Sequence, residues 1–193
     1  MAKVYKFKIR LIGLEDIMWR EIEISSLSTV TKLAYTVMAS FECKGNHLFY
    51  VEYKGQRYEL DFGYDHIGEN NIDPRSVKLE KLNLEIGYTL FLEYDYGCSW
   101  QFNIELISIT DMKRGAGTHY PYTIDGQGKG IIEDMFLDEL IMLMEEIDRT
   151  GEDYLIEENG WTRRWNHNNF NLDIENALLK GEVYKLETIY EYD

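Results

Sequence analysis

The sequence predicts an α+β fold whose antiparallel or mixed sheet is built from hairpins, and three observations support this. Segments with period-two alternation come in neighbouring pairs, a clear helical pattern follows the first pair, and the other helical patterns gather near the C-terminus. A doubly wound parallel sheet would instead alternate strands with helices along the chain. The opening order of two strands, a helix and two strands is also compatible with a β-grasp-like core.

The first predicted unit is a strand pair followed by a helix. Apolar residues alternate with lysine and arginine along residues 5–11, which is typical of a strand with one buried face. A second strand is expected at 18–24. Apolar side chains then recur at helical spacing from Val30 to Phe41, which predicts a helix there, with Ser28 as its N-cap.

Two hairpins follow in the predicted order. The first pairs residues 47–53 with 56–60 across a Lys-Gly turn. The second pairs residues 88–96 with 99–108 near Gly97, where a residue of positive φ is tolerated.

The segments between these units contain many turn-forming residues. Residues 61–74 are rich in Gly, Asp and Asn, which indicates a loop, and residues 78–82 favour a short helical turn. Residues 113–130 contain five glycines, so we expect an irregular segment there.

Two helices are expected in the last third of the chain. The first is long and begins at Glu133 and Asp134, whose carboxylates would complement the helix dipole. The second covers residues 172–180 and is ended by Gly181. The chain is expected to form one domain, residues 1–193, with a β-rich part at 1–130 and an acidic helical part at 131–193.

Charge is distributed unevenly along the sequence. The 193 residues include 35 acidic and 20 basic side chains, for a net charge of −15. Residues 1–132 carry 18 acids and 15 bases, whereas residues 133–193 carry 17 acids and 5 bases. The acidic balance argues against a general nucleic-acid binder and against an anionic membrane surface. The hydrophobic content of 45% excludes global disorder.

Cysteine usage and hydropathy bear on the compartment. Cys43 and Cys98 form no CxxC motif, and one pair is too few for a secreted disulfide scaffold. No apolar run approaches the roughly 20 residues of a membrane span, and the N-terminus alternates like a strand instead of resembling a signal peptide. We therefore expect a cytoplasmic protein with no membrane association.

Five stretches in order resemble the plasmid pRiA4b ORF-3-like family. With the family element that each resembles in parentheses, they are Ile17-Met18-Trp19-Arg20-Glu21-Ile22 ("IWRRI"), His47-Leu48 with Gly55-Gln56-Arg57-Tyr58 ("HL…GxRY"), Tyr94-Asp95-Tyr96-Gly97 with Trp100 ("YDFGDxWxH"), Tyr120-Pro121 with Asp125-Gly126 and Glu133-Asp134 ("YP…DG…PED"), and Phe170-Asn171-Leu172-Asp173 with Asn176 ("FDxxxxN"). The resemblance implies an α+β protein from bacteria or archaea whose gene lies on a chromosome, a plasmid or an insertion element. No activity is established for the family that it resembles, so the resemblance implies none here.

This chain departs from the family pattern at polar positions. The second Asp of "DFGD" is Cys98, the His after the Trp is Phe102, and a second His after "HL" is Phe49. A Phe can neither ligate a metal nor transfer a proton. If other members build a polar or metal site from these positions, the departures argue against an enzyme here.

Several polar residues are candidate functional groups, each with a structural alternative. The candidate catalytic residues are His47, Asp95, His119, Glu133 and Asp134. For Asp95 we favour a structural role, in which its carboxylate accepts nearby amides in a tight turn. Helix capping explains Glu133 and Asp134 as well as a functional role does.

A loop cluster offers candidate cation ligands. Asp61, Asp65 and His66 lie close in sequence, but the EF-hand pattern is missing, and a solvated acidic loop explains them better. The sequence therefore predicts no metal and no cofactor.

Residues 161–167 interleave aromatic and basic side chains. Such a patch can stack bases and bind phosphates. Because it lies in the acidic third, we expect Arg163 and Arg164 to pair with carboxylates instead.

The first functional hypothesis is a non-catalytic protein-interaction module. Its acidic C-terminal surface would favour a basic protein partner. One alternative is a metal-assisted or acid/base hydrolase with a site near Asp95 and His119. Another is an acidic DNA mimic. Nothing in the sequence indicates an oligomeric state.

Overall fold

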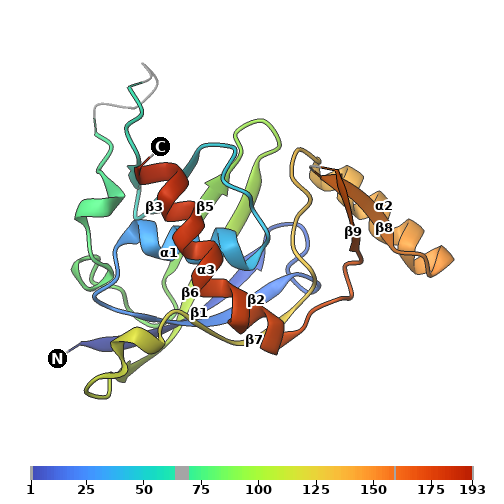
Figure 1. The fold of residues 1–193 in the computed structure, drawn as a ribbon. Helices are drawn as coiled ribbons and strands as arrows, with labels where there is room; N and C mark the ends of the chain where they lie inside the picture. The colour runs from blue at the N-terminus through green and yellow to red at the C-terminus, as the bar shows by residue number, and fades with distance from the viewer. Residues whose placement is uncertain (1, 64–69, 159, 193) are drawn as a thin grey trace.

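The fold is α+β, as predicted, with a seven-stranded sheet, a separate hairpin and three α-helices. The computed structural model describes residues 2–63, 70–158 and 160–192. The sheet has the order β4-β3-β5-β6-β1-β2-β7, and every neighbouring pair of strands within it is antiparallel. Figure 1 shows the sheet beneath α1 and α3, with α2 and the hairpin β8–β9 to one side.

The strands of the sheet follow the predicted alternation. Their bounds are β1 Lys3–Leu11, β2 Trp19–Ser25, β3 Phe49–Tyr53, β4 Gln56–Glu59, β5 Thr89–Tyr94, β6 Trp100–Asp111 and β7 Tyr122–Gln127. On β1, Phe7, Ile9 and Leu11 are fully buried, while Lys8 and Arg10 between them are partly exposed. This alternation places one face of the sheet against the helices.

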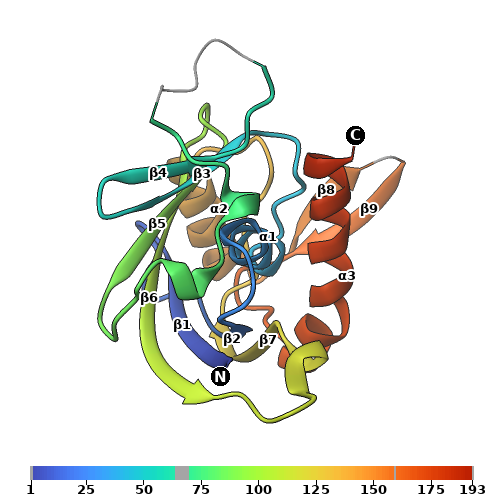
Figure 2. The same ribbon diagram turned by 90° about the vertical axis from the view of Figure 1, so that its left-hand side faces the viewer.

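The first helix lies in the hollow of the curved sheet. α1 spans Val30–Ser40 and is buried on almost every side, because the sheet lies beneath it and α3 lies over it (Figure 2). Its N-cap is Thr29, whose hydroxyl accepts the amide of Lys32 at 3.2 Å, so the expectation of Ser28 was wrong by one residue. The helix is followed by residues 41–48, which cross towards β3.

The last helix is twice as long as expected. α3 spans Leu172–Glu191 and passes through Gly181 without a break. Burial of Val183, Leu186 and Tyr190 against α1 and the sheet stabilises the second half. This packing exceeds the cost of about 1 kcal/mol for an internal glycine.

The segment 113–130 is more regular than its glycines suggested. It contains a 3₁₀ turn, η3 (Ala116–His119), and the edge strand β7, which pairs with β2. The backbone hydrogen bonds offered by β2 form a strand where the sequence predicted none. Two further 3₁₀ turns, η1 (Pro74–Ser76) and η2 (Leu79–Lys81), lie between β4 and β5, and η2 falls within the helical turn predicted at 78–82.

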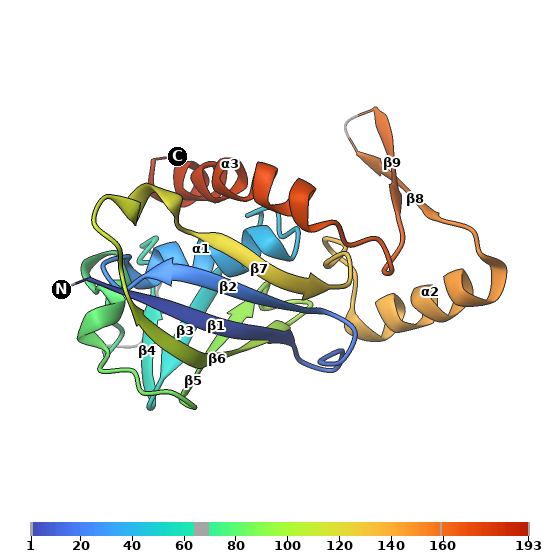
Figure 3. The ribbon, with the colours of Figure 1, turned by 90° about the horizontal axis from the view of Figure 1, so that it is seen from below.

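The first part of the acidic third, α2 and the hairpin after it, lies to one side of the sheet (Figure 3). α2 spans Leu137–Thr150, so Glu133 and Asp134 lie in the loop before it and not in its first turn. The strands β8 (Tyr154–Glu158) and β9 (Trp161–Trp165) form a hairpin that the sequence pattern did not reveal, and Figure 3 shows it standing apart from the sheet beside α2. Among the described residues, no helix has the length and apolarity needed to cross a bilayer.

Candidate functional site

The loop after α1 places His47 beside the end of β5. The hydroxyl of Tyr190, on α3, donates to the backbone carbonyl of His47 and so fixes the loop against the last helix. The imidazole stands edge-on to the ring of Tyr94, with 5.8 Å between ring centroids. His47 is only partly exposed, and both of its ring nitrogens face carboxylates.

Asp95 lies in the tight turn that joins β5 to β6. Its φ of 60° is in the left-handed region, and the residue is 4% exposed. The carboxylate accepts the amide of Gly97 at 2.9 Å and that of Cys98 at 3.3 Å, as expected of an Asp in a turn. The same oxygen lies 3.5 Å from Nδ1 of His47, so the turn also holds the carboxylate against the imidazole.

The loop before α2 brings two more carboxylates. Oδ1 of Asp134 lies 2.8 Å from Nε2 of His47, and Oε1 of Glu133 lies 3.7 Å from the same nitrogen. Glu133 accepts the hydroxyl of Tyr94 and the backbone amide of Lys44, the latter at 3.0 Å. Burial raises the pKa of the Glu133 carboxyl, and burial also raises the pKa of the Tyr94 hydroxyl. The Asp134 side chain is 74% exposed and can move.

Three segments distant in sequence therefore meet at one point. One ligand-type atom from each of His47, Asp95 and Asp134 lies within 4.8 Å of the other two, so small side-chain movements would let all three reach one divalent cation. A cavity of about 530 Å³ adjoins this cluster and is lined by His47, Asp95, Tyr96, Gly97 and Tyr190, among others. An imidazole and carboxylates beside an open cavity can hold a metal ion or transfer a proton.

His119, the fifth candidate catalytic residue, does not join this cluster. It ends η3 and stacks on Tyr122, with 4.6 Å between ring centroids. The strand β7 runs from that end of the sheet towards the loop that carries Glu133 (Figure 3). A six-residue strand spans about 20 Å, which separates His119 from the other four candidates.

The loop predicted to offer cation ligands is only partly described. The Asp61 carboxylate accepts the amide of Gly63 at 2.8 Å and is exposed to solvent. Asp65 and His66 lie outside the described residues, so this cluster stays a prediction.

The two cysteines are free and have raised pKa values. Cys43 is buried, and burial raises the pKa of its thiol. Burial, together with the neighbouring Asp95 carboxylate, raises the pKa of Cys98 to about 11. Cys98 therefore adds a neutral thiol beside Asp95 where the resembled pattern has a second Asp. The other departures, Phe49 and Phe102, are core side chains.

Tyr94, Tyr190 and Arg20 have structural roles that the sequence analysis did not assign to them. The two tyrosines resemble ordinary core aromatics, and nothing in the sequence shows that their hydroxyls reach Glu133 and His47. Arg20 did leave a signal, because it occupies an inward position in the alternation of β2, where Ile22 and Ile24 are buried.

Arg163 and Arg164 pair with carboxylates, in agreement with the expectation for residues 161–167. Arg163 donates to Glu42 at 2.9 Å and lies 3.7 Å from Glu158. Arg164 lies 3.7 Å from Asp153.

Comparisons with known proteins agree with this fold. A family model described as plasmid pRiA4b ORF-3-like protein matches residues 3–176. A solved structure of a protein of unknown function, MM3350 from Methanosarcina mazei Go1, is similar to this chain with a TM-score of 0.67 and 21% identity. The match covers 79% of this chain and 85% of that one, and at this identity it shows the fold alone. No curated protein matches the chain.

Proposed function

The chain belongs to the plasmid pRiA4b ORF-3-like family, and we propose that it is a metal-assisted hydrolase whose divalent cation is held by His47, Asp95 and Asp134. The observation that carries this proposal is the approach of three ligand-type atoms, from three separate loops, to within 4.8 Å of one another. The three loops include stretches on which the family resemblance rests.

The donor set favours a borderline divalent cation. One imidazole nitrogen with two carboxylates suits Zn²⁺, Mn²⁺ or Fe²⁺ better than Ca²⁺, which takes six to eight oxygen ligands. Metal–ligand distances of about 2.0–2.2 Å require His47 and Asp134 to separate slightly from their direct contact. The exposed Asp134 side chain allows this movement, whereas Asp95 is fixed by the amides of its turn.

The surroundings of the cluster support hydrolysis. A Zn²⁺ ion bound to these residues would lower the pKa of its water molecule to about 7. That water would then supply a nucleophile at neutral pH. Tyr94 and the amide of Lys44 orient Glu133 beside His47, so the imidazole is bordered by carboxylates in defined positions. The adjoining cavity, lined in part by the aromatic rings of Tyr96 and Tyr190, gives a substrate room to reach the ion.

Metal titration tests the first part of this proposal. Mn²⁺ and Zn²⁺ would be titrated by calorimetry into the metal-free protein and into the isosteric variant Asp95→Asn. We expect one ion per wild-type chain and an affinity about a hundredfold lower in the variant, since a fixed ligand is lost. Asp73→Asn is the matched control, because Asp73 is a partly exposed turn carboxylate outside the cluster that accepts a similar hydrogen bond, from the amide of Arg75 at 2.9 Å. Absence of saturable binding to the wild type would contradict the proposal.

Hydrolysis is tested on the loaded protein. Three substrates, p-nitrophenyl acetate, p-nitrophenyl phosphate and bis(p-nitrophenyl) phosphate, separate carboxyl-ester from phosphoester hydrolysis. We expect metal-dependent release of p-nitrophenol that Asp95→Asn removes and Asp73→Asn retains. Tight metal binding without turnover of any ester would contradict the enzymatic part and leave a metal-binding protein.

A second candidate function is the protein-interaction module, favoured by the exposed apolar side chains of the acidic third. Trp161 is 82% exposed, and Met142 and Leu155 are also exposed on α2 and β8. Pull-down from native extract at low and raised salt, with wild type and Trp161→Ser, would test it. A partner that both proteins retain equally would count against this surface. The DNA-mimic alternative gains no such support. A mimic would present an acidic surface, whereas three of the five basic residues in this third lie together around one cavity.

A further inference from the structure

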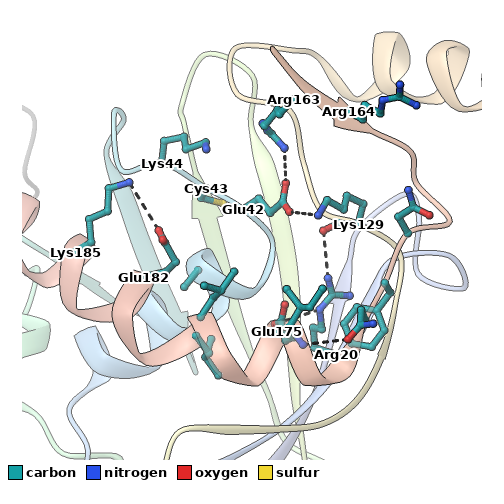
Figure 4. Close-up of a pocket in the computed structure, with 17 residues that line it drawn as sticks. Arg20, Glu42, Cys43, Lys44, Lys129, Arg163, Arg164, Glu175, Glu182 and Lys185 are labelled. Carbon is teal, nitrogen blue, oxygen red and sulfur yellow. Dashed lines mark hydrogen bonds and ion pairs between the residues drawn. The ribbon is translucent and has the colours of Figure 1, made fainter. Parts of the chain in front are cut away.

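A second cavity, of about 670 Å³, lies where the end of α1, β9 and the first turns of α3 meet (Figure 4). Its volume is in the range of small-molecule sites. The lining carries an excess of positive charge, although the whole protein has a net charge of −15. It includes three acids, Glu42, Glu175 and Glu182, and six bases: Arg20, Lys44, Lys129, Arg163, Arg164 and Lys185.

The acidic third supplies half of these bases. Residues 133–193 contain only five basic side chains, and Arg163, Arg164 and Lys185 all line the cavity. The other two, Arg149 and Lys180, lie outside it. The fold thus gathers the scarce cations of an acidic region around one cavity.

Arg20 provides a fixed positive charge at the inner end. Its side chain is fully buried, and its terminal nitrogens donate to the carbonyls of Gln127 at 2.6 Å and Gly128 at 2.8 Å. Its Nε has no hydrogen-bond partner and lies 3.6 Å from Oε1 of Glu175, which also has none. Two buried polar atoms with unused capacity therefore border the cavity.

The other basic side chains around the cavity form long or shared ion pairs. Nζ of Lys44 lies 3.5 Å from Glu158, and Nζ of Lys185 lies 3.8 Å from Glu182, which are ion-pair distances longer than a good hydrogen bond. Glu42 is shared between Lys129 and Arg163, each at 2.9 Å, so one carboxylate faces two cations (Figure 4). These side chains can therefore donate hydrogen bonds to a bound anion and still remain close to their own carboxylates.

One wall of the cavity is apolar. Ile174 and Leu178, one turn apart on α3, are both more than half exposed, and Leu179 and Phe170 lie next to them. An inorganic ion alone would leave this wall uncovered. A ligand with an apolar group next to its charge would cover the wall and meet the cations together.

We propose that this cavity binds a small organic phosphate, with the phosphate among Lys44, Arg163 and Lys185 and the apolar part against Ile174 and Leu178 of α3. A phosphate ester carries up to two negative charges and several acceptor oxygens, which suits a group of arginines and lysines better than a single carboxylate does. The inference does not depend on the proposed metal site, two of whose ligands, His47 and Asp95, line the other cavity.

Calorimetric titration with three probes tests the inference. Phenyl phosphate carries both features, inorganic phosphate only the charge, and phenol only the ring. We expect saturable binding of phenyl phosphate, weaker binding of inorganic phosphate, and no measurable binding of phenol. The double variant Arg163→Gln/Lys185→Gln should bind phenyl phosphate at least about tenfold more weakly. Raised salt should weaken the wild-type interaction.

The matched control has the same change of charge in the same third of the chain. Arg149→Gln/Lys180→Gln removes the two bases that lie outside the cavity and should retain wild-type affinity for phenyl phosphate. Equal weakening by both double variants would overturn the proposal, because the effect would then be one of net charge. No binding of phenyl phosphate, or binding of a single-stranded oligonucleotide alone, would also overturn it.

Discussion

The loop of residues 43–47 separates two cavities of opposite character. Cys43 and Lys44 line the cavity with six bases, whereas Gly45, Asn46 and His47 line the one beside the carboxylates of Asp95 and Asp134. Both cavities also border α3. A net charge of −15 therefore describes neither of them, because the fold and not the composition determines which charges lie together.

The contrast can persist because charges in proteins act over short distances. At physiological salt the screening length is about 8 Å, so each cavity is governed mainly by the groups that line it. Along the sequence the charge is most acidic in residues 133–193, yet this part supplies Asp134 to the cluster around His47 and three cations to the other cavity.

Removing the buried base of the cationic cavity should have the largest effect. In Arg20→Met, the carbonyls of Gln127 and Gly128 lose their donors and Glu175 loses its counter-ion. We expect the free energy of unfolding to fall by about 3–5 kcal/mol, measured by urea denaturation. Arg10→Met, which removes a partly exposed pair with Glu105, should cost less than about 1 kcal/mol. Similar losses in the two variants would show that Arg20 has no special structural role.

The next effect concerns the loop that divides the cavities. Gly45 has a φ of +83°, and a Cβ there would lie 2.8 Å from a methyl carbon of Leu186. Gly45→Ala should lower the free energy of unfolding by about 2–3 kcal/mol and weaken both Mn²⁺ and phenyl phosphate binding, since the shared loop shifts. Gly55→Ala has a similar positive φ with open space around it, so it isolates the backbone cost of about 1–2 kcal/mol. Equal losses in the free energy of unfolding for both variants would mean that the Leu186 side chain moves aside without cost.

Tyr94→Phe should sharpen the contrast by affecting one side only. Its hydroxyl donates to Glu133 and accepts the amide of Gly45 at 3.2 Å. We expect a loss of about 1–2 kcal/mol in stability and Mn²⁺ affinity about tenfold lower, with phenyl phosphate binding unchanged. Tyr53→Phe, another buried tyrosine in the sheet, serves as the control for removing a hydroxyl. A change in phenyl phosphate binding would indicate that the two cavities are coupled through Glu133.

The smallest expected effect is a pH dependence from Glu175. Burial raises the pKa of its carboxyl despite the nearby Arg20. Because the pKa is raised by folding, the contribution of Glu175 is fully present below its unfolded value and is lost as the pH rises through its folded value. The unfolding free energy of wild type should therefore fall relative to that of Glu175→Gln as the pH rises above about 4, the usual pKa of an unfolded Glu.

A surface carboxylate provides the opposite slope. Arg149 lowers the pKa of the exposed Glu146, so wild type should gain stability relative to Glu146→Gln as the pH rises over its titration range. Denaturant midpoints across the pH series would compare the two differences. Parallel curves for both variants would contradict the assignment of the raised pKa to Glu175.

The sequence predicted the fold best where one face of a strand is buried. The alternation along β1 and the spacing along α1 are both direct consequences of burial, and both elements were found. The strands β7 and β8–β9 were missed because most of their residues are exposed, so no buried face imposes an alternation on them. The end of α3 was missed because packing of Val183 and Leu186 outweighs the local effect of Gly181.

The candidate site was predictable as residue types but not as a group. His47, Asp95, Glu133 and Asp134 were all identifiable from the sequence, yet only the sheet order brings their loops together. His119 was placed with them only on the family resemblance at Tyr120-Pro121 and Glu133-Asp134, and β7 separates it from Glu133. The cationic cavity left no motif, since its bases come from β2, β9, α3 and the loops near Lys44 and Lys129.

The most direct test of two independent sites of opposite charge is a paired titration. Mn²⁺ and phenyl phosphate would each be titrated by calorimetry into wild type, Asp95→Asn and Arg163→Gln/Lys185→Gln. We expect Asp95→Asn to lose Mn²⁺ binding and retain phenyl phosphate binding, and the double variant to show the reverse. Loss of both ligands in either variant, or of neither, would contradict the independence of the two sites.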